Sequence, residues 1–230
     1  MKSLLFSFTL LLMSLSTYAQ DAHALVQKVK ARLDKVNDYK AEGRMKMDVS
    51  FIDAPPSKIE IFYKKPNRFK VKKDGGISIL PKGGVSINLG SLLSSQEFDV
   101  VPRKDTVMNG STLKVVKLLP ADENSDVVLT TLYIDERSVV VRKATIATRE
   151  SGSYEIDLSY GKYLDWGLPD KVIFSFNTKD YKLPKGITFE YEKGGKKKVE
   201  DMKNKKGRVE ITYSSYVINK GVDDKVFAGK

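Results

Sequence analysis

The sequence contains no cysteine and only one histidine, His23. Without cysteine the chain forms no disulfide, so its hydrophobic core must be large enough to stabilise the fold unaided. Zinc and copper sites need clusters of cysteine and histidine, and a Ser-His-Asp triad needs a histidine in a packed position, whereas His23 lies close to the N-terminus. No P-loop or dinucleotide-binding motif occurs. We therefore expect a binding protein, not an enzyme, with no metal and no cofactor.

Long apolar runs are also absent after the first residues. Lys2 precedes an apolar stretch over Leu4–Leu15, and Thr17-Tyr18-Ala19 supplies a small-residue cleavage site. This pattern predicts a signal peptide over residues 1–19. The alternative, a membrane anchor, is disfavoured because the run is shorter than the roughly 20 residues that a spanning helix needs. Residues 20–230 are then expected to form one soluble periplasmic domain, with no cysteine at the cleavage site to carry a lipid.

Acidic residues are outnumbered by basic ones, and the formal net charge is +11. Such a charge suits nucleic acid, an anionic membrane surface or an acidic partner. Export and the lack of any nucleic-acid-binding motif argue against nucleic acid. Lys196, Lys197 and Lys198 lie in a lysine-rich run between Lys193 and Arg208. The run suggests either transient contact with anionic lipid headgroups or, as the preferred alternative, a solvated hairpin tip.

The chain begins with one clear helical pattern and continues with strand patterns. Apolar residues at helical spacing predict an amphipathic helix over Asp21–Val36. Val127–Ile134, Val139–Thr148, Tyr154–Tyr160 and Val172–Phe176 are β-branched or alternating segments joined by short turns, which predicts an antiparallel meander. The remaining expected strands are Met45–Phe51, Ile59–Tyr63, Phe69–Val71, Ile77–Ile79, Val85–Leu89, Val115–Leu119, Ile187–Tyr191 and Val209–Tyr213.

These elements predict a mostly β, α+β fold in one domain. A single large curved antiparallel sheet of about 10–11 strands would form an incomplete barrel. It would wrap over the N-terminal helix and over short helices, one of them between Leu89 and Phe98. A closed eight-stranded barrel of the lipocalin type is the competing architecture.

Val29–Ala41 combines the end of a helix, a polar break and the start of a strand, and Tyr63–Phe69 contains a basic-Pro-Asn turn between aromatic residues. These stretches resemble the opening and the turn motif of the LolA/LolB-like family of periplasmic lipoprotein carriers. Leu132–Asp135, Leu168-Pro169 and Val217–Phe227 match further phrases in the expected order. Together they cover most of the chain that follows the signal peptide. The resemblance implies a half-barrel with helices over its mouth and a hydrophobic cavity between them.

The resemblance also implies a function and partners. Family members carry the acyl chains of lipoproteins through the periplasm, from an inner-membrane ABC transporter to an outer-membrane acceptor. Related domains bind a protein partner in envelope-stress sensors, which leaves a regulatory sensor as the alternative. In the carriers the basic residue of the turn, typically arginine, bonds to the helix lid and closes the empty cavity. Lys65 takes that gate position here. Its ammonium group is a point charge, whereas the guanidinium of arginine is planar and presents several donors in a fixed geometry.

The candidate ligand-binding residues are the apolar side chains expected on the concave side of the sheet and on the facing side of the helix. They are Leu25, Val29, Leu33, Met45, Met47, Val49, Ile59, Ile61, Tyr63, Phe69, Ile156, Leu158, Phe174 and Phe189. The methionines favour a pocket that adapts to lipid, because thioether side chains repack easily. The alternative is that all of these residues fill a dry core.

Overall fold

The structure is a computed structural model. It describes residues 20–48, 55–73, 89–94, 97–149, 152–177 and 206–228. The predicted signal peptide and the predicted strands Ile77–Ile79 and Ile187–Tyr191 lie outside these ranges. So does the predicted strand Val85–Leu89, except for Leu89, which begins a helix. The described strands form one sheet of ten strands in the order β3-β2-β1-β10-β9-β8-β7-β6-β5-β4. Every neighbouring pair in it is antiparallel.

The strands follow the chain order except where β10 lies between β1 and β9. Their bounds are β1 Asp38–Asp48, β2 Ser57–Lys64, β3 Arg68–Lys73, β4 Phe98–Met108, β5 Ser111–Pro120, β6 Val127–Asp135, β7 Val140–Thr148, β8 Ser153–Ser159, β9 Lys171–Asn177 and β10 Lys206–Ile218. Two short 3-10 helices, η1 (Leu164–Trp166) and η3 (Asp224–Val226), lie in connecting segments. The predicted meander is confirmed as β6 to β9.

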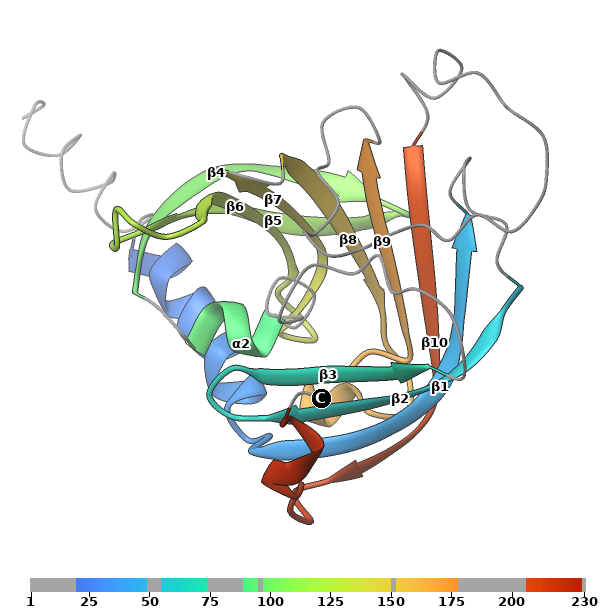
Figure 1. Ribbon diagram of the computed structural model, residues 1–230. Coiled ribbons are helices and arrows are strands. Elements are labelled where there is room, and N and C mark those ends of the chain that lie inside the picture. The colour runs from blue at the N-terminus through green and yellow to red at the C-terminus, as the bar shows by residue number, and fades with distance from the viewer. Residues whose placement is uncertain are drawn as a thin grey trace, which may run out of the picture.

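The sheet curls around an N-terminal helix over residues 20–33 and around α2 (Leu89–Ser94), which lie on its concave side (Figure 1). The helix turns Leu25, Val26 and Val29 into the core, and α2 contributes Leu89, Leu92 and Leu93. Because strands such as β1, β8 and β9 bury alternate residues on this face, both helices cover an apolar surface that would otherwise face water. The fold is the predicted incomplete barrel.

Two details of the elements differ from the prediction. The helix ends at residue 33 instead of Val36, since the Lys35 and Val36 amides bond to oxygens three residues back and tighten the last turn. The strand β4 was not predicted, because the charged run Arg103-Lys104-Asp105 interrupts the apolar alternation in its sequence and none of its side chains is fully buried. Among the described strands the sheet is open, with β3 and β4 at its edges, which favours the predicted incomplete barrel over the closed eight-stranded alternative.

Candidate functional site

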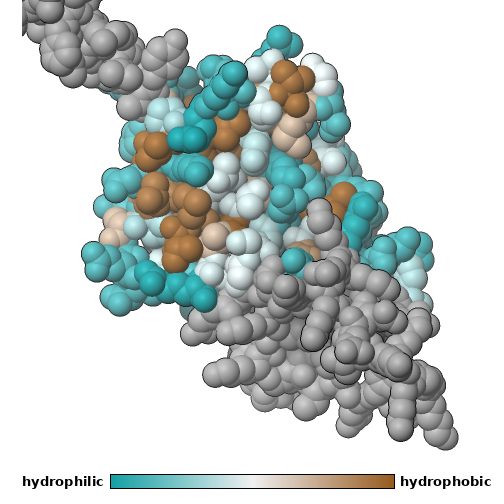
Figure 2. Space-filling model, turned by 90° about the horizontal axis from the view of Figure 1, so that it is seen from above, coloured by the Kyte–Doolittle hydropathy of each residue, from teal (hydrophilic) through white to brown (hydrophobic). Residues whose placement is uncertain are grey.

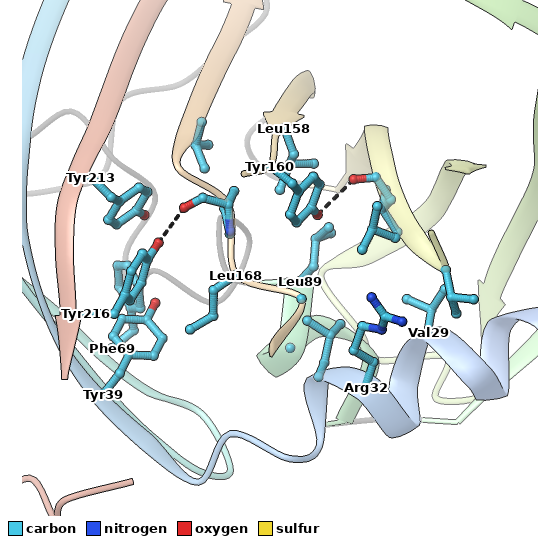
Figure 3. A pocket seen from close by; sticks show the side chains of 18 residues that line it. Val29, Arg32, Tyr39, Phe69, Leu89, Leu158, Tyr160, Leu168, Tyr213 and Tyr216 are labelled. Atoms are coloured by element: carbon cyan, nitrogen blue, oxygen red, sulfur yellow. Dashed lines mark hydrogen bonds between the residues drawn. The ribbon is translucent and has the colours of Figure 1, made fainter. Parts of the chain in front are cut away.

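A pocket lies between the N-terminal helix and the concave face of the sheet (Figure 3). Its empty volume is about 550 Å³, including the part that opens to solvent. Aliphatic and aromatic side chains dominate its walls, and those from the sheet lie on β3, β1, β10, β9, β8 and β7. The lining residues are Val29, Arg32, Leu33, Tyr39, Phe69, Leu89, Gly90, Val139, Val140, Val141, Leu158, Tyr160, Gly167, Leu168, Pro169, Val172, Tyr213 and Tyr216.

Three consecutive valines line the pocket where the β6–β7 hairpin turns. The Asp135 carboxylate accepts hydrogen bonds from the backbone amides of Arg137 and Ser138 and is paired with Arg142 at 2.9 Å. The pKa of Asp135 is held below its ordinary value: burial opposes ionisation, but the bonds from Ser138 and Arg142 outweigh it. This fixed turn leaves Val139 at φ 50°, a left-handed conformation that a β-branched residue rarely adopts. The strained turn directs three apolar residues to the pocket.

A bulge in β10 brings two tyrosines to the same pocket. Residues three apart on a regular strand face opposite sides of the sheet. The register with β1 slips between Glu42 and Gly43, so that Ser214 is an extra residue and its hydroxyl donates to the Glu42 oxygen. Tyr213 and Tyr216 therefore both line the pocket.

Tyr216 is the centre of a group of tyrosines, which we call the tyrosine cluster. Its ring lies 4.9 Å from Tyr213, 4.8 Å from Tyr163 and 5.3 Å from Tyr39, measured between centroids. Tyr63 joins through Tyr39, at 5.3 Å. Burial raises the pKa of Tyr39, Tyr213 and Tyr216 above the ordinary value. The cluster is thus an uncharged wall with a few polar oxygens.

Three side-chain hydrogen bonds tie the segment between β8 and β9 to β7, to β10 and to the N-terminal helix. The Tyr160 hydroxyl donates to the Val141 oxygen at 2.9 Å, and the Tyr216 hydroxyl donates to the Pro169 oxygen at 2.7 Å (Figure 3). From the helix, Arg32 donates to the Leu164 oxygen at 3.1 Å. Burial raises the pKa of Tyr160, so its hydroxyl keeps the proton that it donates. The pocket rim is tied to helix and sheet alike.

The predicted apolar residues that fall within the described ranges lie on the concave side of the sheet or on the side of the helix that faces it. Leu25, Met45, Met47, Ile59, Ile61, Tyr63, Ile156 and Phe174 are buried in the core cluster. Val29, Leu33, Phe69 and Leu158 line the pocket. Val49 and Phe189 lie outside the described residues, as do Lys196, Lys197 and Lys198. The apolar face therefore serves both as packed core and as pocket wall.

Sequence reasoning missed Arg32 and most of the tyrosine cluster. Arg32 is not among the apolar positions that predict the amphipathic helix, and Tyr213 and Tyr216 have no common phase in a regular strand. Lys65, predicted as a gate, does contact the end of the helix: its side chain bonds to the backbone oxygen of Asp34.

Other site types find little support in the described part of the chain. Within it, no group of three or more His, Asp or Glu side chains is arranged to hold a metal ion. None of the helices there is both long and apolar enough to cross a membrane. Figure 2 shows apolar residues gathered in a patch among hydrophilic ones on one face. The large apolar side chains most exposed in the described ranges are Val101, Val107, Leu119, Val128, Trp166 and Val217.

An open antiparallel sheet that curls over an amphipathic helix, with an apolar pocket between them, defines this protein as an incomplete barrel. No protein-family model and no curated protein matches the sequence. The fold matches solved structures over nearly their full length. One is a putative outer membrane lipoprotein-sorting protein domain from Vibrio parahaemolyticus, at 15% identity and TM-score 0.57, with 91% of this chain and 97% of that chain covered.

Two further structures share the fold. A LolA superfamily protein from Nitrosomonas europaea matches at 9% identity and TM-score 0.55, covering 90% of this chain and 97% of that one. A DUF1329 family protein from Desulfovibrio piger matches at 10% identity and TM-score 0.58, covering 92% and 97%. The chain therefore has the LolA-like fold, as the motifs Val29–Ala41 and Tyr63–Phe69 predicted.

Proposed function

We propose that the protein is a carrier that binds the acyl chains of lipoproteins, or of other lipids, in the pocket beneath the N-terminal helix. The observation that supports this most directly is the composition of the pocket wall, in which aliphatic and aromatic side chains from the helix and the sheet dominate. Ligand pockets in other proteins are likewise lined mostly by apolar and aromatic side chains with a few polar groups. The LolA-like fold supports the same proposal, since two of its structural relatives are a lipoprotein-sorting domain and a LolA superfamily protein.

Burial of apolar surface is sufficient to drive such binding. Each methylene group removed from water contributes about 0.8 kcal/mol, so a single acyl chain supplies several kcal/mol. No covalent step is involved, and the protein acts as a carrier and not as an enzyme. The proposal places residues 20–230 in the periplasm after removal of residues 1–19. There an inner-membrane ABC transporter and an outer-membrane acceptor would be donor and recipient.

Lys65 fits this scheme as a gate. Its bond to the Asp34 backbone ties the turn between β2 and β3 to the end of the helix that covers the pocket. Breaking this tie would let the helix end move away from the sheet. Ligand exchange then requires no change within the core.

The experiment is native mass spectrometry with lipid extraction on the protein purified from its own periplasm. Bound lipoprotein, phospholipid or fatty acid supports the carrier.

Val172→Trp fills the pocket from β9 and is expected to lower acyl-chain affinity at least about tenfold. Val217→Trp adds the same group at a position that is 51% exposed, and it should leave affinity unchanged. A protein without bound lipid that also ignores added acyl ligands contradicts the proposal.

A second candidate is an envelope sensor that binds a protein partner with the same fold. The edge strand β4 favours it, because among the described strands β4 pairs only with β5 and because Val107 on it is 67% exposed. Open edges of this kind accept an added strand. A sensor should bind its protein partner without lipid turnover, whereas a carrier should release its lipid to an acceptor.

A further inference from the structure

Arg32 is the one charged residue among the described residues that line the pocket. A cation in an apolar wall loses hydration, and this loss is costly unless the charge meets a partner. In Figure 3, Arg32 lies on the side of the helix that faces Tyr160. A charge at this position needs a partner that compensates for its lost hydration.

The local structure holds this side chain in place. Its Nη1 atom donates to the Leu164 oxygen at 3.1 Å. Its aliphatic stem packs on Gly167, which has φ +67°; a Cβ atom there would lie 3.3 Å from the Arg32 Cγ. Gly167 thus leaves the room that the arginine stem occupies, and the half-buried Arg32 is held with its charged end at the pocket wall.

Most of the hydrogen-bonding capacity of Arg32 remains. A guanidinium carries five N–H donors, and the Leu164 oxygen takes one. Among the described residues no carboxylate forms an ion pair with Arg32. Arg142, whose guanidinium lies 5.5 Å from the centre of the Tyr160 ring, differs in this respect because it is paired with Asp135 at 2.9 Å. The Tyr160 hydroxyl donates its proton to the Val141 oxygen, so it does not compete with Arg32 as a hydrogen-bond donor to a ligand.

We propose, on the basis of the proposed carrier function, that the pocket binds acyl lipids with an anionic headgroup and that Arg32 binds that headgroup. The planar guanidinium matches the two oxygens of a carboxylate or a phosphate, and these charge-assisted hydrogen bonds are stronger than neutral ones. The acyl chain lies along the apolar wall that includes Leu158 and Val172. The headgroup neutralises the charge that the pocket otherwise leaves unpaired.

The test compares ligands with one chain and different headgroups on delipidated protein. Myristate and 1-myristoyl lysophosphatidic acid are the anionic probes, 1-myristoyl glycerol is the neutral probe, and inorganic phosphate is a probe without a chain. The expected result is at least tenfold tighter binding of the anionic lipids. Arg32→Gln should weaken only these, by about tenfold to a hundredfold, and Arg32→Lys by less. Arg44→Gln, which removes an exposed arginine from the outer face of β1, is the charge control and should change nothing.

Each other outcome has a definite meaning. Equal affinity for charged and neutral lipids, or an equal loss of both in Arg32→Gln, means that Arg32 only anchors the helix, and the carrier proposal survives. Competition by inorganic phosphate as strong as by the lipids means an anion site without lipid selectivity, which also overturns the inference. If the wild type binds none of the lipids, the carrier proposal fails together with it. Thermal unfolding confirms that each variant is folded, and Arg32→Lys serves if Arg32→Gln is not.

Discussion

The Lys65 side-chain nitrogen donates to the backbone oxygen of Asp34 at 2.5 Å and lies 3.2 Å from the Asp34 carboxylate. The Lys65 amide also donates to the Asn37 oxygen at 2.8 Å. Lys65 therefore bonds to the segment that leaves the helix at two points. A cation at this place is favourable because the last carbonyl oxygens of a helix have no partner within the helix.

Replacing Lys65 by methionine should loosen the end of the helix. We expect Lys65→Met to lower the free energy of unfolding by about 1 kcal/mol or less, because both side chains are partly exposed and solvent screens the pair. If Lys65 is the gate, lipid also dissociates faster in this variant. Chemical denaturation and stopped-flow release of a fluorescent fatty acid measure the two effects. Lys58→Met, on an exposed position of β2, is the control. Unchanged release alongside reduced stability would show that the contact is structural only.

Thr130 should be replaceable by valine with a gain in stability. Its side chain is fully buried, and its hydroxyl has no hydrogen-bond partner within the described residues. Valine has nearly the same shape and removes the desolvated hydroxyl, so we expect Thr130→Val to raise the unfolding free energy by about 1 kcal/mol. Denaturant midpoints measure it, and Thr131→Val, which lies on the other face of β6, should change stability by less. A loss of stability in Thr130→Val would indicate that the hydroxyl has a partner.

Gly43 should not tolerate a side chain. A Cβ atom at this position would lie 2.5 Å from the backbone oxygen of Thr212, across the bulge between β1 and β10. Since backbone cannot move aside as a flexible side chain does, Gly43→Ala should cost at least about 2 kcal/mol. Because the bulge sets the phase of Tyr213 and Tyr216, ligand affinity should fall as well. Full stability in Gly43→Ala would mean that the bulge can shift without cost.

The tyrosine cluster predicts a loss of stability at high pH. Burial raises the pKa of Tyr39 in the folded protein, so the folded state keeps a proton that the unfolded chain loses near pH 10. Stability is then full below about pH 10 and falls as the pH rises further. In Tyr39→Phe, the loss between pH 9 and pH 11 should be smaller by about 1 kcal/mol. Denaturation curves at several pH values measure this difference between the wild type and Tyr39→Phe. Lysines also titrate in this range, but they are the same in both proteins, so their contribution cancels in the comparison. Parallel curves for the two proteins would contradict the prediction.

The central meander was predictable because its signal is local. In β8 the residues Tyr154, Ile156 and Leu158 alternate strictly with polar ones, and a strand with one buried face requires that pattern. The edge strand β4 was not predictable for the converse reason. Arg103, Lys104 and Asp105 lie in its middle, and neither face is consistently buried.

The pocket was harder to predict than the sheet. Alternation correctly selected Leu158 and Phe69, but it also selected Ile61 and Phe174, which are core residues with 0% and 1% exposure. An inward-facing side chain can pack against another side chain or can border the pocket, and its position along the strand decides which. The outcome depends on segments that are distant in the sequence, so local alternation does not reveal it. Arg32 looked solvent-exposed because the segment that covers it, around Leu164 and Gly167, is far away in the sequence.

The place of β10 in the sheet affects the order of assembly. The strands β4 to β9 pair in sequence order, and so do β1 to β3, but these two groups meet only where β10 lies between β1 and β9. The group β1 to β3 can therefore join the group β4 to β9 only after residues 206–218 have paired with residues 38–48. Contacts between segments so distant in sequence form slowly. Phe69 belongs to one group, Val140 to the other, and Tyr216 to the strand that joins them. A chain that has not yet docked β10 can already hold two separate apolar sheets, but it has no pocket in which to enclose a lipid.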